Sequence, residues 1–253
     1  MSTKLATKTK KVSRHKKKSK KSNVKSNTKT KPMEIEYEAK FLEIDYKELI
    51  DKLKALGAKS IHPNTLYKRS MFSLADVKRG YVRVRNEGDK TTLTAKIYKD
   101  SKFPQEYELQ IKDDFENGQE FLRALNLDEK GYHETMREKW QLPCGKNDKF
   151  CEVCIDRIPG IPTYVEIECK SKKNLNKAIK MLYLDKYKKL FGSYGKCFVE
   201  YYGMTENDLN NVIPKLTFGN IKNELKTYIK KNEALLDRVS KEHLDTYKTL
   251  NLH

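Results

Sequence analysis

Charged and apolar residues alternate along several stretches of this chain of 253 residues. In residues 33–41 every second position is Glu or Lys, and the positions between them are apolar or aromatic. Because successive side chains of a β-strand point to opposite faces, this period predicts a strand with one charged and one apolar face. The same period predicts seven further strands, at about residues 66–73, 81–86, 92–98, 106–112, 134–142, 149–157 and 163–170.

Four other segments show the helical period. Residues 46–56 place Leu49, Ile50 and Leu53 on one face and end before Gly57, a common helix stop. Further helices are predicted at about residues 119–125, 175–190 and 220–247. Most connections between the strands are too short for a crossover helix, so the sheet is predicted to be antiparallel and the fold to be α+β.

The charged faces of these strands are sorted by sign. The first strand carries Glu36 and Glu38 and the last carries Glu166 and Glu168, which places two carboxylates about 7 Å apart on one side of each strand. Like charges in such rows repel unless protons or cations lie between them. The other residues in the charged phase are Glu34, Glu106, Glu108, Glu152 and Asp156, with the cations Lys40, Arg83, Arg85, Lys96 and Arg137.

Two arrangements could accommodate this charged face. An open sheet could pack its apolar face on helices and leave the charged face in water, which is common for antiparallel sheets. Alternatively, an eight-stranded antiparallel β-barrel covered by helices would enclose the charges in a bore wide enough for one small ligand. A solvated face normally mixes charge signs, so the sorting favours the barrel. Its carboxylates suit Mg²⁺ or Mn²⁺, and its Lys and Arg side chains suit a polyanion.

The N-terminal segment, residues 1–32, has a different composition. It contains twelve Lys and one Arg with no Asp or Glu, so it carries +13 of the formal net charge of +18. Such a segment cannot bury apolar surface, and we expect a disordered basic tail. It could be a nuclear address or an arm for nucleic acid or another anionic surface, or it could only solubilise the chain.

The sequence shows no run of 18 apolar residues and no apolar stretch typical of a secretory signal near its N-terminus. We therefore expect an intracellular protein, cytoplasmic or nuclear, without a membrane span. The odd number of five Cys in that setting predicts reduced thiols. Cys151 and Cys154 have CxxC spacing, but residues three apart on a strand face opposite sides, which disfavours a zinc site.

Four blocks of residues resemble the CYTH superfamily, the triphosphate tunnel metalloenzymes. Glu36-Tyr-Glu38-Ala-Lys40 matches the ExExK signature of that family. The other blocks follow in the family's order: Tyr81-Val-Arg-Val-Arg85 with Leu93-Thr-Ala-Lys96, then Arg137-Glu-Lys-Trp140, then Val153-Cys-Ile-Asp156 with Tyr164-Val-Glu-Ile-Glu168. The resemblance covers about residues 33–202, so the predicted domains are the tail at 1–32, a tunnel domain at 33–202 and a helical C-terminal extension at 203–253.

The resemblance implies roles for particular residues in an eight-stranded antiparallel tunnel. Glu36, Glu38, Glu108, Glu166 and Glu168 would bind the metal, and Lys40, Arg83, Arg85, Lys96, Arg137 and Lys196 would bind the substrate. Glu38, Glu168 and Asp156 are the candidate catalytic residues. The chain departs from the family at Thr135, at Ile161-Pro162, and in Tyr67-Lys-Arg-Ser-Met-Phe72, which lacks a clear counterpart of a family Asp. These departures bear on the substrate more than on the fold.

The implied function is hydrolysis of the terminal phosphate of an inorganic or organic triphosphate, with Mg²⁺ or Mn²⁺. The same clamp would serve an adenylyl cyclase that converts ATP to cyclic AMP and pyrophosphate, and the residue spacing does not separate the two. A non-catalytic binder of polyphosphate or RNA ends is a third alternative, which the many carboxylates disfavour because they would weaken an anion receptor. The sequence does not indicate an oligomeric state.

Overall fold

A computed structural model describes residues 37–98, 105–145, 150–190, 194–205, 208 and 215–250. The chain divides into two units, residues 1–34 and residues 35–253, and every described residue belongs to the second unit. The predicted basic tail and Glu36 lie outside the described residues.

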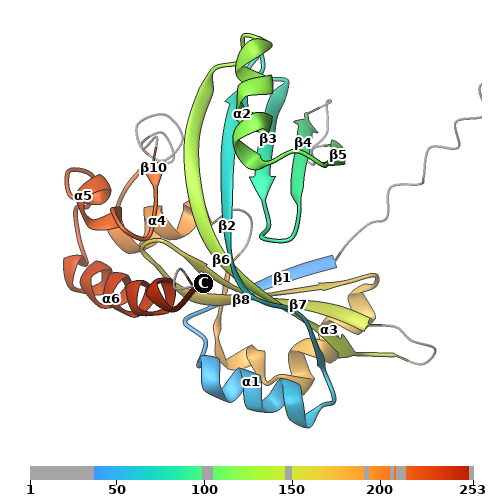
Figure 1. Ribbon diagram of the computed structural model, residues 1–253. Helices are drawn as coiled ribbons and strands as arrows, with labels where there is room; N and C mark the ends of the chain where they lie inside the picture. The colour runs from blue at the N-terminus through green and yellow to red at the C-terminus, as the bar shows by residue number, and fades with distance from the viewer. Residues whose placement is uncertain are drawn as a thin grey trace, which may run out of the picture. The chain divides into compact units, whose positions relative to one another are not determined.

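The second unit is built on one curved sheet of ten strands (Figure 1). They are β1 (Tyr37–Leu42), β2 (Lys59–Ser73), β3 (Gly80–Asn86), β4 (Thr91–Ile97), β5 (Gln105–Ile111), β6 (Glu129–Pro143), β7 (Phe150–Ile158), β8 (Ile161–Cys169), β9 (Lys188–Leu190) and β10 (Lys215–Leu216). Their order is β5-β4-β3-β2-β6-β7-β8-β1-β9, and β10 pairs with β6. All pairs are antiparallel except the parallel pair of β10 and β6.

The antiparallel α+β fold predicted from the sequence is confirmed, and the eight predicted strands correspond to β1–β8. The sequence predicted that eight strands close into a barrel, whereas the described strands form an open path that ends at β5 and β9. The reason is that β9 pairs with the edge of β1 that would have to receive β5, in a register that joins Lys40 to Leu190. The curved sheet therefore resembles a tunnel without being a closed barrel.

The helices are α1 (Tyr46–Ala55), α2 (Phe115–Ala124), α3 (Lys172–Met181), α4 (Gly195–Tyr202), α5 (Ile221–Leu225) and α6 (Glu233–Leu250), with a short 3₁₀ helix η1 (Leu184–Lys186). The predicted helices at 175–190 and 220–247 were too long. Tyr183 has a φ of 52°, a left-handed conformation that ends the first, and the chain then forms η1 and β9. Asn232 has a φ of 61° just before α6, so the second divides into α5 and α6.

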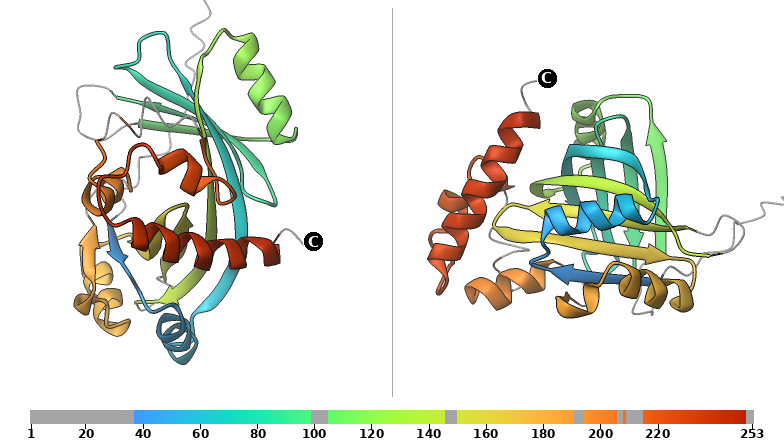
Figure 2. Two further views of the ribbon diagram at one scale, coloured as in Figure 1. Left: turned by 90° about the vertical axis from the view of Figure 1, so that its left-hand side faces the viewer. Right: turned by 90° about the horizontal axis from the view of Figure 1, so that it is seen from below.

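Helices α1, α2 and α3 cover the apolar face of the sheet, as the strand period predicted. Leucines of α1 and α3 pack in one cluster with Phe41, Val153 and Ile167 of the sheet, and both helices lie on the same part of it, away from α2 (Figures 1 and 2). A separate cluster joins α2 to β2 and β3. The segments β10, α5 and α6 share a third hydrophobic cluster with β1, β7 and β8. The predicted domain boundary at residue 202 stays a prediction.

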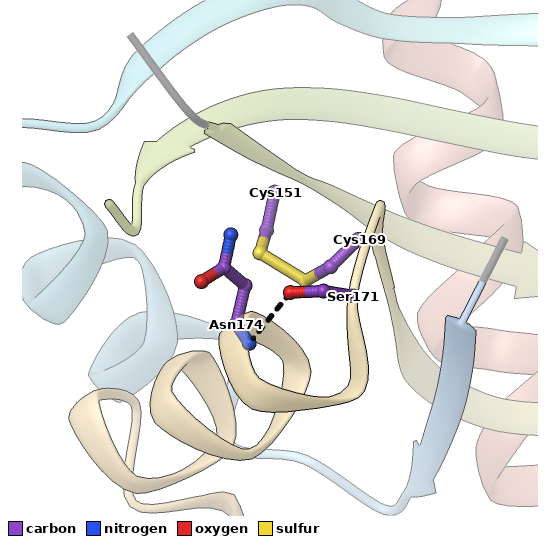
Figure 3. The surroundings of a disulfide bond; sticks show 4 residues. All are labelled: Cys151, Cys169, Ser171 and Asn174. Carbon is purple, nitrogen blue, oxygen red and sulfur yellow. Dashed lines mark hydrogen bonds between the residues drawn. A yellow bond between two sulfur atoms is a disulfide. The ribbon is translucent and has the colours of Figure 1, made fainter. Parts of the chain in front are cut away.

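The expectation of reduced thiols was wrong for one pair of cysteines. Cys151 and Cys169 form a disulfide beside the N-terminal turn of α3, where the hydroxyl of Ser171 accepts a hydrogen bond from the backbone N–H of Asn174 (Figure 3). The reason is the register of β7 and β8, which sets these residues directly opposite each other with Cα atoms 4.6 Å apart. Cys154 lies on the opposite face of β7 and is a free thiol, as the strand period requires.

Candidate functional site

The strand registers bring the predicted charged residues together on the concave face of the sheet. We divide this face into two parts. The carboxylate half comprises Glu38, Lys40, Arg137, Lys139, Glu152, Asp156, Glu166 and Glu168 on β1, β6, β7 and β8. The arginine half comprises Arg69, Arg83, Arg85, Glu87, Lys96, Glu106 and Glu108, on β2 to β5 and the turn that follows β3.

A row of three carboxylates crosses the carboxylate half. Glu152, Glu168 and Glu38 occupy directly opposed positions on β7, β8 and β1. Like charges at opposed positions of a sheet destabilise it unless something compensates them. Lysines supply part of that compensation, because Lys139 lies 3.1 Å from Glu152 and Lys40 lies 2.9 Å from Glu38.

Glu166 lies two residues before Glu168 on the same face of β8 and is paired with Lys40 of β1. The distance between Nζ of Lys40 and the nearer carboxylate oxygen of Glu166 is 3.3 Å. Burial raises the pKa of Glu166 to about 7, and the charge of Asp156 adds to this effect, while Lys40 and Arg137 oppose it. For Glu38, burial acts to raise the pKa, but hydrogen bonds to Glu166 and Lys40 and the charge of Lys40 outweigh it, so its pKa is lowered. Glu38 is therefore the ionised member of this carboxylate pair and Glu166 is the member that holds a proton more readily.

Arg137 and Asp156 form the most regular ion pair of the face. Nε and Nη2 of Arg137 donate to the two carboxylate oxygens of Asp156 at 2.6 and 2.7 Å. Although burial opposes its charge, Asp156 holds the pKa of Arg137 well above its ordinary value. Both oxygens of Asp156 are occupied, so this residue orients Arg137, which also lies 3.5 Å from Glu166.

The arginine half places three guanidinium groups on two neighbouring strands, with Arg69 on β2 and Arg83 and Arg85 on β3. Nη2 of Arg83 lies 3.7 Å from Glu108 and donates to the hydroxyl of Thr94 at 3.2 Å. Arg85 pairs with Glu87 and lies 3.8 Å from Glu108. Burial, and then the charges of Arg85 and Arg69, lower the pKa of Arg83 to about 10.

Lys96 connects the two halves electrostatically. Its ammonium lies 2.6 Å from Glu106 of the neighbouring strand β5. Its charge also contributes to lowering the pKa of Glu38 on β1, which is far from β4 in the strand order.

Three of the predicted site residues are not placed with the others on the carboxylate row or among its neighbouring cations. Glu108 lies between Arg83 and Arg85 and accepts a hydrogen bond from Thr94 at 2.9 Å, away from the row of Glu38 and Glu168. Lys196 lies on α4 and is exposed, and within the described parts of the chain no hydrogen bond or ion pair joins it to the concave face. The role predicted for Glu36 falls outside the described residues.

Two site residues were missed from the sequence. Glu152 was placed in the charged phase but not among the metal ligands, although its register completes the row with Glu168 and Glu38. Arg69 was passed over because its segment lacked the expected Asp. The alternation of Tyr67, Arg69 and Met71 with Lys68 and Ser70 is the signal that could have found it, since it sets Arg69 on the same face as Arg85.

The donor set of the carboxylate half fits a hard divalent cation. Its row offers only carboxylate oxygens, the ligands that Mg²⁺ and Mn²⁺ prefer. Within the described residues no three acidic or His/Cys side chains converge closely enough to form a metal cluster, because Glu38 and Glu152 are turned towards lysines. The fit therefore rests on the chemistry of the row and on its register. No helix in the described part of the chain has the length and apolarity needed to cross a membrane.

The family model of the CYTH domain matches residues 34–193. The chain belongs to the CYTH domain family. No curated protein sequence matches it. An adenylate cyclase candidate from Vibrio parahaemolyticus has the same fold, with a TM-score of 0.51 at 10% identity over 64% of this chain and 95% of the other.

Two further solved structures are similar to this CYTH chain at lower TM-scores. A protein from Hippeastrum, described as an adenylyl cyclase candidate with a dominant triphosphatase activity, is 19% identical with a TM-score of 0.44, over 66% of this chain and 96% of its own. A conserved hypothetical protein from Pyrococcus furiosus is 22% identical with a TM-score of 0.44, over 60% of this chain and 93% of its own.

Proposed function

We propose that this CYTH protein is a divalent-metal-dependent triphosphatase that hydrolyses the terminal phosphate of an inorganic or organic triphosphate. The observation that carries the proposal is the division of one concave face into a carboxylate half and an arginine half. Carboxylates outnumber cations on the first, and cations outnumber carboxylates on the second. A polyanion bound with a divalent cation is the ligand that would compensate both excesses.

In this proposal the cations hold the phosphate chain. The planar guanidinium groups of Arg83 and Arg85 would each donate two hydrogen bonds to phosphate oxygens. Lys40 and Lys96 would act as point charges on either side of the chain. Arg137 would donate its remaining N–H groups to phosphate oxygens, in an orientation that its hydrogen bonds to Asp156 fix.

Glu38, Glu152 and Glu168 would hold Mg²⁺ or Mn²⁺. When bound, such a cation would neutralise phosphate charge and lower the pKa of a coordinated water. The carboxylate of Glu38 or Glu168 would orient the attacking water, and phosphoryl transfer needs little more from a protein than such positioning and charge stabilisation. The water oxygen would form a bond to the terminal phosphorus and give a proton to that carboxylate, the bond from the phosphorus to the bridging oxygen would break, and the diphosphate would leave with the electron pair.

The test is a panel of substrates in the presence of Mg²⁺ or Mn²⁺: tripolyphosphate, ATP, thiamine triphosphate and RNA with a 5′-triphosphate. Phosphate, pyrophosphate and cyclic AMP are measured separately. The proposal expects phosphate from at least one substrate and none in excess EDTA. Cyclic AMP with pyrophosphate as the main products would assign cyclase chemistry instead, and binding without any product would assign a receptor.

A further inference from the structure

Arg69 occupies a position that the predicted substrate-binding set does not include. It stands directly opposite Arg85 on β3 and opposite His133 on β6. Its charge contributes to lowering the pKa of Arg83 and of His133, and from across the face it opposes the rise that burial causes in the pKa of Tyr164 on β8. Groups on three other strands therefore sense Arg69, which places its guanidinium on the concave face rather than in outer solvent.

The partners of Arg69 are neutral groups. Its Nη2 donates to the hydroxyl of Tyr194, which lies just before α4, and Nδ1 of His133 lies 3.0 Å from the same hydroxyl. Burial, followed by the charge of Arg69, lowers the pKa of His133 to about 3, so His133 is neutral at physiological pH. Within the described residues no ion pair joins Arg69 to a carboxylate, unlike Arg85 and Arg137.

Two buried donors in this cluster have no hydrogen-bond partner within the described residues: Nε of Arg69 and Nε of Arg83. The side chain of Arg83 is only 9% exposed, so its charge is largely removed from water. Buried donors and opposed like charges are both costly, and an anion with several oxygens between the guanidinium groups would relieve both costs.

We infer that Arg69, Arg83 and Arg85 form a subsite for an unesterified terminal phosphate group, with Tyr194 orienting Arg69. A terminal phosphate carries a charge of about −2 at neutral pH and three outer oxygens, which suits three guanidinium groups. An inner phosphate of the chain carries less charge and has fewer free oxygens. The inference rests on the proposed function and sharpens it, because it sets the direction of the phosphate chain: the free end lies at the arginine half, and any organic group lies away from it.

Two small inorganic probes show whether Arg69 recognises a terminal phosphate or only attracts anions by its positive charge. Tripolyphosphate is linear and has free ends, whereas trimetaphosphate is cyclic and has none. Each is titrated by calorimetry into the full-length chain in EDTA, which prevents metal-dependent turnover. We expect Arg69→Gln to weaken tripolyphosphate binding about ten- to hundredfold, the usual cost of a charge-assisted contact, and trimetaphosphate binding less than threefold.

Three further variants control this comparison. Lys68→Gln removes the same charge from the opposite face of β2 and should leave both affinities unchanged. Arg69→Lys keeps the charge but loses the planar fork, so it should fall between Arg69→Gln and the unaltered chain. Tyr194→Phe should weaken only tripolyphosphate binding, about threefold, because Arg69 loses the hydroxyl that orients it.

The outcomes are distinguishable. Unchanged tripolyphosphate affinity in folded Arg69→Gln and Arg69→Lys would overturn the inference while leaving the proposed function intact. An equal loss for both probes would also overturn it, because Arg69 would then supply only general positive charge. If the unaltered chain bound no tripolyphosphate in EDTA or with Mg²⁺, the proposed function would fall and the inference with it.

Discussion

The two halves of the concave face handle their charges differently. In the carboxylate half each described cation has a close carboxylate: Arg137 has Asp156, Lys40 has Glu38, and Lys139 has Glu152. In the arginine half Arg85 and Lys96 also have close carboxylates, but Arg83 lies no nearer than 3.7 Å to Glu108 and Arg69 is held by neutral groups. The first half therefore pairs each of its described cations, whereas the second leaves the charges of Arg83 and Arg69 available for a ligand. Substitutions should separate these two roles.

The largest expected effect is on turnover, from the row of carboxylates. Glu168→Gln or Glu38→Gln should lower turnover about 10²- to 10³-fold or abolish it, because one charged ligand of the row is lost. The free energy of unfolding should change by less than about 1 kcal/mol, because relief of the repulsion between opposed carboxylates offsets the loss of pairs such as that of Glu38 with Lys40. Turnover of tripolyphosphate with Mg²⁺ and urea unfolding would be measured together. Glu120→Gln on the surface of α2 is the matched control, and full activity of Glu168→Gln would contradict the proposed metal row.

The next effect tests the ion pairs of the carboxylate half. Asp156→Asn should lower the free energy of unfolding by about 3 kcal/mol, because it leaves the guanidinium of Arg137, whose side chain is 25% exposed, without its bidentate partner. This is the low end for a broken buried pair, since Glu166 remains near Arg137. The control is Glu106→Gln, which breaks the more exposed pair with Lys96 and should cost less than about 1 kcal/mol. Equal costs in urea unfolding would remove the distinction between the halves.

The third effect is on binding in the arginine half. Arg85→Lys or Arg83→Lys keeps the charge but loses the fork, and should weaken triphosphate binding by about 1.5–3 kcal/mol. Arg83→Gln should weaken binding further without lowering stability, because it removes a buried charge that Arg85 and Arg69 already disfavour. Calorimetric titration and urea unfolding of the same samples would check both statements. If the Arg85→Lys variant bound every triphosphate tested as tightly as the unaltered chain, the guanidinium of Arg85 would not be a phosphate ligand.

The features behind these predictions could be predicted from the sequence to different degrees. The period of two places Lys40, Arg83 and Arg137 on one face without knowledge of the fold, because side-chain direction on a strand is local. The partners across strands are not local. That Glu152 faces Glu168, and that Cys151 faces Cys169, depends on the register of β7 with β8. Arg69 also shows this limit, since its role follows from Arg85 beside it and from Tyr194, 125 residues away.

A smaller effect concerns pH. His133 has a pKa of about 3 in the folded chain, below its ordinary value of 6.5, so between these values only the unfolded chain binds the proton. Its contribution to stability is therefore complete above pH 6.5 and is lost as the pH falls towards 3. From about pH 7 to about pH 5.5 the loss should be about 1 kcal/mol, and His133→Gln should abolish that part of it.

Arg69→Gln offers a second measurement of the same group. It removes the charge that adds to burial in lowering the pKa of His133, so the chain should become less sensitive to acid. Urea unfolding of both variants over this pH range would provide the data. Parallel stability profiles for the unaltered chain and His133→Gln would show that His133 is not protonated on unfolding.

The smallest expected effect on catalysis comes from deleting residues 1–32. A chain that starts at Met33 keeps every residue of both halves, while it loses a segment of +13 charge that has few apolar residues with which to build a core. It should fold and turn over small triphosphates at an unchanged rate. If the segment binds nucleic acid, the affinity of the full-length chain for RNA or DNA should fall steeply with salt, and the shortened chain should lose most of that affinity and of its salt dependence. A solubilising segment predicts the same catalysis and no salt-sensitive binding to lose. Affinities of both chains at two salt concentrations separate these alternatives, and loss of tripolyphosphate hydrolysis in the shortened chain would show that the boundary at residue 33 cuts into the machinery of the concave face.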